Sequence, residues 1–163
     1  MGRVLVIGDV ILDEYITGDT NRISPEAPVI VLEMTDRRSC LGGAANVAVG
    51  ASAAGADVAL IGVIGSDETS SEIMRLISVC SLDHSLVTQI GRTTTKKTRF
   101  TSSGHQLLRT DVETVCDVAQ PTADRVLEHT RHWMQPAASS DIVVLSDYAK
   151  GVLTFDVCRG VID

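Results

Sequence analysis

One continuous stretch, residues 42–65 (GGAANVAVGASAAGADVALIGVIG), restricts the fold of this chain more than any other part of it. A glycine pair leads into a run of small residues that predicts a helix over 44–54, and the apolar run 58–64 predicts a buried parallel strand. The paired glycines allow the backbone to approach a ligand closely, and the helix start presents backbone amides beside the side chain of Asn46. This combination indicates a sugar site at the edge of an α/β sheet.

The start of the chain also combines a buried strand with polar groups that follow it. Residues 4–7 form a short apolar run, and Gly8 ends it before two carboxylates, Asp9 and Asp13. Ligands of open α/β sheets bind beyond the carboxyl ends of the strands, so both acids are expected to face that crevice. A carboxylate accepts hydrogen bonds from vicinal sugar hydroxyls, which predicts substrate binding for Asp13 first and for Asp9 second. A turn or capping role for the two acids is the alternative.

Helix and strand patterns alternate along the chain, which favours an α/β fold with a mostly parallel sheet and helices on its faces. Turn residues and capping signals place the boundaries between them. The strands are expected at 4–7, 58–64, 85–88 and 142–146, and the helices at 44–54, 67–78 and 119–134.

Two segments, 15–40 and 92–112, lack helical periodicity and are rich in Thr, Val, Ile and Arg. The second is expected to form a hairpin that turns at residues 102–104, and the first contains a strand over 29–33. We expect the two segments to pair into one small sheet apart from the main one, with an exposed apolar face that includes Val29, Val31, Phe100 and Leu107. Such a face predicts a homodimer that forms through this small sheet.

Composition and charge exclude several classes of function. The formal net charge is -7 and no basic cluster stands out, which argues against a nucleic-acid or membrane-surface role. No apolar run approaches the roughly 20 residues of a membrane-spanning helix, and the first residues lack a secretory signal, so a cytoplasmic protein is expected. The cysteines and histidines are dispersed, which predicts free thiols and no metal site. The basic pair Lys96 and Lys97 is interpreted as a solvated strand face.

The glycine-rich stretch resembles the first of the two motifs of the ribokinase-like (PfkB) carbohydrate kinases. The match holds at every fixed position, namely Gly42, Gly43, Ala44, Asn46, Ala48, Gly55 and Gly65. This resemblance implies a three-layer αβα domain with a small β lid built from segments 15–40 and 92–112. It also implies that Asp13 contacts the sugar beside Gly42, Gly43 and Asn46, and that lid closure excludes water from phosphoryl transfer.

Two further stretches, residues 22–29 (RISPEAPV) and 145–151 (LSDYAKG), resemble a narrower group in this family, the kinases of D-glycero-D-manno-heptose 7-phosphate. Those enzymes phosphorylate the anomeric hydroxyl, on the route to ADP-heptose and lipopolysaccharide. A phosphorylated substrate needs cationic partners. The candidates are Lys150, Arg109 and Arg99 for the phosphate, and Asp147 for sugar hydroxyls. The alternative is that these cations pair with nearby acids such as Asp147 or Asp111.

The second motif of the family, a G-A-G-D sequence that carries the catalytic base and helps to hold ATP, is absent from this sequence. The resemblance therefore implies that residues 1–163 are the truncated, N-terminal, sugar-binding part of one ribokinase-like domain. The catalytic residues and the sites for ATP and Mg²⁺ are then expected in a missing C-terminal half, and the 163-residue chain alone is expected to be inactive.

Other functions stay open at this point. One is another kinase of the same family, acting on ribose, fructose or a hexose phosphate. A second is a non-catalytic sugar-binding or assembly module, because the phosphoryl-transfer motif is absent. A dinucleotide-binding oxidoreductase domain is disfavoured, because no G-x-G-x-x-G motif follows the first strand.

Overall fold

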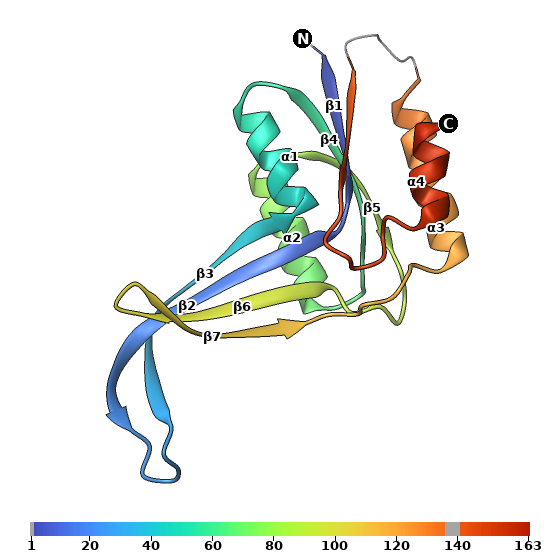
Figure 1. Cartoon of the computed structure of the whole chain (residues 1–163). Helices are drawn as coiled ribbons and strands as arrows, with labels where there is room; N and C mark the ends of the chain where they lie inside the picture. The colour runs from blue at the N-terminus through green and yellow to red at the C-terminus, as the bar shows by residue number, and fades with distance from the viewer. Residues whose placement is uncertain (1, 136–140) are drawn as a thin grey trace.

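The computed structural model describes residues 2–135 and 141–163, which form two sheets with helices packed on one of them (Figure 1). The main sheet has four parallel strands in the order β5 (Asp83–Thr88), β4 (Asp57–Ile64), β1 (Arg3–Gly8) and β8 (Ile142–Ser146). β1 lies inside this sheet and is buried on both sides, which explains its uninterrupted apolar run. The predicted α/β fold with a mostly parallel sheet is confirmed.

Helices cover both faces of the main sheet and give the molecule three layers. One face carries α1 (Ala44–Ala53) and α2 (Glu68–Val79), and the other carries α3 (Gln120–Trp133) and α4 (Phe155–Ile162). Neighbouring residues of β1 point to opposite faces, so Val6 joins the core under α1 and α2 while Leu5 and Ile7 join the core under α3 and α4. Full burial of one such aliphatic side chain is worth about 1.5–3 kcal/mol, so these two cores hold the layers together.

A second sheet extends away from the three layers, as Figure 1 shows most clearly for the end of β2 and β3. Its strands have the order β3 (Ile30–Gly43), β2 (Val10–Ile23), β6 (Thr95–Ser102) and β7 (His105–Val112). β2 pairs antiparallel with β3 and parallel with β6, and β6 and β7 form a hairpin. Segments 15–40 and 92–112 therefore contribute to one sheet, although β2 and β3 are much longer than the strand expected at 29–33.

Asp9 alone separates β1 from β2, so the chain passes from one sheet into the other within a single residue. Gly8 does not introduce a turn, because the apolar residues that follow it, Val10 to Leu12, are buried and continue as a strand. Asp13 consequently lies inside β2 and not in a loop beyond a strand end.

The second sheet has two different faces, because side chains alternate along its strands. We call the face that carries Asp13 the site face and the opposite face the outer face. The register places Asp13, Tyr15 and Arg99 on the site face, and Glu14, Ile16 and Phe100 on the outer face.

The apolar residues of the outer face differ in part from those expected. Phe100 pairs with Leu108, and an irregularity beside this pair leaves Leu107 without a register partner. Val29 precedes β3 and is exposed, whereas Val31 is partly buried. The residue beside Phe100 is therefore Leu108 and not Leu107, because the extra residue shifts the alternation of β7 by one position.

The helices are short, and in residues 2–135 and 141–163 none combines the length and the apolar content needed to cross a bilayer. The cysteines at positions 40, 80, 116 and 158 are free thiols. Within the described part of the chain, no three His, Cys, Asp or Glu side chains come together as a metal site requires.

Candidate functional site

Asp13 lies on the site face of β2, close to the junction of the two sheets. Its Oδ1 atom accepts a hydrogen bond from Nη1 of Arg99 at 2.5 Å, and this contact raises the pKa of Arg99. Gly42 lies against the same carboxylate, because a Cβ atom at position 42 would be 2.3 Å from Oδ2 of Asp13. The side chain of Asp13 is 19% exposed. Arg99 and the bare backbone of Gly42 therefore hold a partly exposed carboxylate that can accept hydrogen bonds from hydroxyl groups.

The start of α1 is the second part of this site. Gly43 has a φ of 57°, in the left-handed region that favours glycine, and a Cβ atom there would lie 2.2 Å from the carbonyl oxygen of Asp9. The same oxygen accepts a hydrogen bond from the backbone N–H of Ala44 at 2.9 Å. The glycine pair thus brings the first turn of α1, with the exposed side chain of Asn46, against the strand that carries Asp13.

Asp9 is buried, and its carboxylate is used inside the protein. Oδ2 accepts hydrogen bonds from the backbone N–H groups of Tyr148 and Lys150 at 2.8 and 3.1 Å, and Oδ1 accepts one from Val152 at 3.2 Å. These three bonds fix the loop that follows β8. The geometry favours this structural role for Asp9, which corresponds to the turn or capping alternative, over direct sugar contact.

The loop after β8 carries two further candidates, Asp147 and Lys150. Oδ1 of Asp147 accepts a hydrogen bond from the backbone N–H of Ala149 at 2.7 Å, and the residue is exposed. Lys150 extends toward the second sheet, where Nζ donates to Oε1 of Glu113 at 2.9 Å. Lys150 is thus paired with an acid, as the alternative interpretation expected, but the acid is Glu113 and not Asp147 or Asp111.

Arg109 and Lys97 continue this charged network along the site face. Arg109 donates to both carboxylate oxygens of Asp111, at 2.9 and 3.1 Å, and Lys97 donates to Oδ2 of Asp111 at 3.0 Å. Nζ of Lys97 also lies 3.7 Å from Oε2 of Glu113. The hydrogen bonds from Lys97 and Arg109 outweigh the opposing effect of burial and lower the pKa of Asp111, which favours the charged form of this carboxylate.

Lys97 and Glu113 are candidates that the sequence alone did not reveal. The interpretation of Lys96 and Lys97 as one solvated face is wrong, because neighbouring residues of a strand point to opposite faces. Lys96 approaches Glu14 on the outer face to 4.0 Å, while the side chain of Lys97 is only 15% exposed among the acids of the site face. Strand alternation was the signal that could have separated the two lysines, whereas Glu113, just beyond β7, gives no comparable signal.

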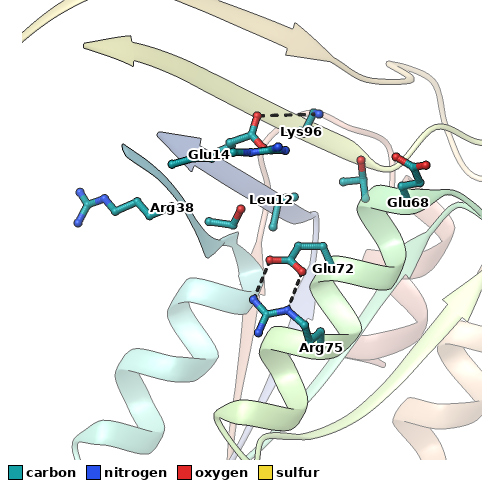
Figure 2. A pocket seen from close by; sticks show the side chains of 10 residues that line it. Leu12, Glu14, Arg38, Glu68, Glu72, Arg75 and Lys96 are labelled. Atoms are coloured by element: carbon teal, nitrogen blue, oxygen red, sulfur yellow. Dashed lines mark hydrogen bonds and ion pairs between the residues drawn. The ribbon is translucent and has the colours of Figure 1, made fainter. Parts of the chain in front are cut away.

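A cavity of about 570 Å³ lies on the outer face, between the second sheet and α2 (Figure 2). Its lining is mostly charged. Figure 2 shows Glu14 beside Lys96 at one side, the Glu72–Arg75 ion pair on α2 at the other, and Arg38 directed away from the cavity. Small-molecule sites are usually more apolar than this, with only a few polar groups.

Most charged side chains at this cavity have a partner among the described residues. Arg37 donates to Oε1 of Glu14 at 2.9 Å through Nε, and Thr98 donates to Oε2 at 2.9 Å. Burial alone would raise the pKa of Glu14, but these hydrogen bonds together with the charge of Lys96 hold it below the ordinary glutamate value. This ion-pair group favours a structural role for the outer-face cavity, and the candidate site stays on the site face.

Comparison with known proteins gives matches over nearly the whole chain. Residues 1–156 match the family described as pfkB family carbohydrate kinase. The chain is 43% identical over 164 residues to the bifunctional protein HldE of Gluconobacter oxydans (strain 621H), an alignment that covers 99% of this chain and 33% of the relative. It is 47% identical over 152 residues to the D-beta-D-heptose 7-phosphate kinase of Bordetella bronchiseptica, covering 93% of this chain and 47% of the relative.

Solved structures share the fold at lower identity. Phosphofructokinase-2 from Escherichia coli, in complex with fructose-6-phosphate, has a TM-score of 0.73 and 20% identity, covering 99% of this chain and 50% of that chain. A carbohydrate kinase from Agrobacterium tumefaciens has a TM-score of 0.62 and 17% identity, covering 89% and 45%. The chain therefore spans from about a third to about half of the length of the proteins it matches.

Proposed function

Because the chain belongs to the PfkB carbohydrate kinase family, we propose that it forms the sugar-binding part of an ATP-dependent kinase. The proposed reaction is phosphorylation of the anomeric hydroxyl of D-glycero-D-manno-heptose 7-phosphate. The names of the two relatives at 43% and 47% identity support this substrate class. The observation that carries the proposal is the partly exposed carboxylate of Asp13, held by Arg99 against Gly42 beside the start of α1.

In this proposal the second sheet acts as the lid and the start of α1 as the floor of the sugar site. Asp13 accepts hydrogen bonds from sugar hydroxyls, and Asn46 offers both a donor and an acceptor to the same ring. Each of the three predicted cations has an acidic partner, Arg99 in Asp13, Arg109 in Asp111 and Lys150 in Glu113. We place Lys150 first for the substrate phosphate because an ammonium group has three donors and the hydrogen bond to Glu113 uses one of them. Asp147 lies exposed on the same loop as Lys150, where it can accept from a hydroxyl group.

ATP and Mg²⁺ are the co-substrate and the metal ion that such a reaction requires. No three His, Cys, Asp or Glu side chains come together among the described residues, and Mg²⁺ in kinase sites is typically held by one or two carboxylates together with the phosphates. The starts of α2 and α4 are occupied by the side chains of Asp67 and Thr154, which accept hydrogen bonds from Ser70 and Val157. We therefore propose that the nucleotide, the metal and the catalytic base belong to the additional length that the relatives have.

A binding experiment tests this function directly. We expect the protein to bind heptose 7-phosphate by calorimetry, and Asp13→Ala to weaken the affinity about 10- to 100-fold because a charged hydrogen-bond acceptor is lost. Asn46→Ala should weaken it less, while Ser52→Ala, on the exposed far end of α1, serves as the matched control. Unchanged affinity in both the Asp13 and the Asn46 variants would remove these residues from the site. Tighter binding of ribose or fructose than of heptose 7-phosphate would favour another kinase of the family.

We also infer a homodimer that forms through the outer face of the second sheet. Ile16, Phe100 and Leu108 carry its apolar part, and Leu108 is 57% exposed. Apolar residues on an exposed sheet face are typical of an interface between identical chains. We expect Leu108→Glu to lower the dimer fraction in sedimentation equilibrium, and Ile90→Glu, at an exposed position after β5, to leave it unchanged. A wild-type protein that is monomeric at the highest soluble concentration would contradict the dimer.

A further inference from the structure

Two lysines from distant parts of the chain meet on one carboxylate, that of Glu113. Lys97 comes from β6, Lys150 from the loop after β8, and Glu113 from the segment just beyond β7. Oε1 of Glu113 accepts a hydrogen bond from Nζ of Lys150 at 2.9 Å, and Oε2 lies 3.7 Å from Nζ of Lys97. The three side chains are 15–19% exposed, so water screens this contact less than an ion pair on the open surface. Glu113 thus connects the second sheet to the loop that Asp9 anchors in the main body.

The hydrogen-bonding capacity of this group is only partly used. An ammonium group has three donors, and the contacts among the described residues use one on Lys97 and one on Lys150. Oε2 of Glu113 is buried and accepts no hydrogen bond from the described residues. Four donors on the two lysines are therefore available beside the candidate sugar site.

The charge balance of this group favours an anion. Within residues 2–135 and 141–163, three cations, Lys97, Lys150 and Arg109, form ion pairs with only two carboxylates, Asp111 and Glu113. Asp13 and Arg99 next to them neutralise each other. A phosphoryl group brings negative charge and several acceptor oxygens, which match both the surplus cation and the available ammonium donors.

We propose that Glu113 is a positioning residue that holds Lys97 and Lys150 together as one cationic pair for a phosphoryl group. This inference rests on the proposed function. It adds two residues to that function: Lys97 as a second phosphate ligand, and Glu113 as a residue that touches no ligand itself. The phosphoryl group has two sources in a sugar-phosphate kinase, the phosphate already on the sugar and the terminal phosphate of ATP. Both present the same chemistry to the two ammonium groups.

The direction in which Glu113→Gln changes phosphate affinity distinguishes a positioning role of Glu113 from a purely electrostatic one. Glu113→Gln removes a negative charge beside the proposed anion site, so electrostatics alone would tighten phosphate binding. If Glu113 instead positions the lysines, the same change releases two flexible side chains. Phosphate binding is then weaker, because the conformational entropy of both lysine side chains is lost only when the ligand binds. The two explanations therefore predict opposite results.

The experiment measures affinities of the purified protein for heptose 7-phosphate, unphosphorylated heptose, ATP and inorganic phosphate. We expect wild type to prefer heptose 7-phosphate over heptose, and Glu113→Gln, Lys97→Gln and Lys150→Gln each to reduce that preference about tenfold. The unphosphorylated sugar should bind these variants as it binds wild type, which a general loss of structure would not allow. Glu72→Gln, an equal charge change on α2, is the matched control and should leave all four affinities unchanged. A loss confined to ATP would assign the pair to the nucleotide.

Two results would overturn the inference. One is a Glu113→Gln variant that binds every phosphate ligand as tightly as wild type or more tightly. The other is a loss of equal size for heptose and heptose 7-phosphate, which would show that the substitution disturbs the sugar site as a whole. Failure of wild type to bind either sugar would instead contradict the proposed function. Inorganic phosphate would then still decide the role of Glu113, since its binding must fall in the variant if the inference is right.

Discussion

Replacing Asp9 by alanine should strongly destabilise the protein, because Asp9 is buried and its carboxylate is hydrogen-bonded inside the molecule. The carboxylate accepts three backbone hydrogen bonds from the loop after β8 and is 1% exposed. An unsatisfied buried donor costs about 1–3 kcal/mol, and three such donors with partial relaxation of the loop give an expected loss of about 3–5 kcal/mol. This is a large share of the ~5–15 kcal/mol by which ordinary domains are stable.

Urea denaturation measures this loss, with an unchanged slope showing that the native and unfolded states are otherwise the same. Asp9→Asn should cost less, about 1–2 kcal/mol, because its carbonyl oxygen keeps the bonds from Tyr148 and Lys150 while its amino group opposes the N–H of Val152. Asp147→Ala is the control in the same loop. Its exposed carboxylate accepts one amide, so the expected change is below about 1 kcal/mol. An Asp9→Ala protein within about 1 kcal/mol of wild type would refute the structural role of the carboxylate.

Three further outcomes follow from the backbone and from one buried acid. Gly43→Ala should lower the free energy of unfolding by more than about 2 kcal/mol in urea denaturation, because of its positive φ and its contact with backbone, whereas Gly50→Ala, in open space on α1, should raise it by about 0.5–1 kcal/mol. Gly42→Ala should displace the carboxylate of Asp13 and reduce sugar affinity in calorimetry more than it reduces stability. The lowered pKa of Glu14 means that its ion pair stabilises the fold above the ordinary glutamate pKa of about 4.3 and is lost as the pH falls through the lower folded-state value. Glu14→Gln should therefore destabilise the protein at pH 7 and flatten the acid limb of its stability curve.

The elements of the main sheet could be predicted from the sequence because each is defined locally. The strand at 142–146 has the expected bounds, and the helix expected at 119–134 occupies Gln120–Trp133, with a proline in its first turn. The second sheet was harder, because a 14-residue strand such as β2, with Gly, Asp and Asn near its far end, has no uniform apolar alternation. Its stability comes from partners on both sides, and those are not local in sequence.

The candidate site also has one part that is defined locally in the sequence and one part that depends on long-range contacts. Gly42, Gly43 and Asn46 form a local pattern, and they lie together at the start of α1. The ion pairs are long-range: 86 residues separate Asp13 from Arg99. Sequence reasoning can nominate charged residues, but it cannot pair them, since pairing depends on the register of strands that are far apart along the chain.

Because Asp9 alone separates β1 from β2, the point at which the second sheet leaves the main sheet is fixed by this one residue. Every polar group of Asp9 is engaged, with its N–H on Ser146, its carbonyl on Ala44 and its carboxylate on the loop after β8. Rotation at this point would break all of those bonds at once. The irregularities further along β2, between Thr17 and Gly18 and between Asp19 and Arg22, interrupt the ladder with β3 at a distance from this junction. The base of the second sheet, which carries Asp13, is therefore fixed to the main body through the backbone and the carboxylate of a single residue.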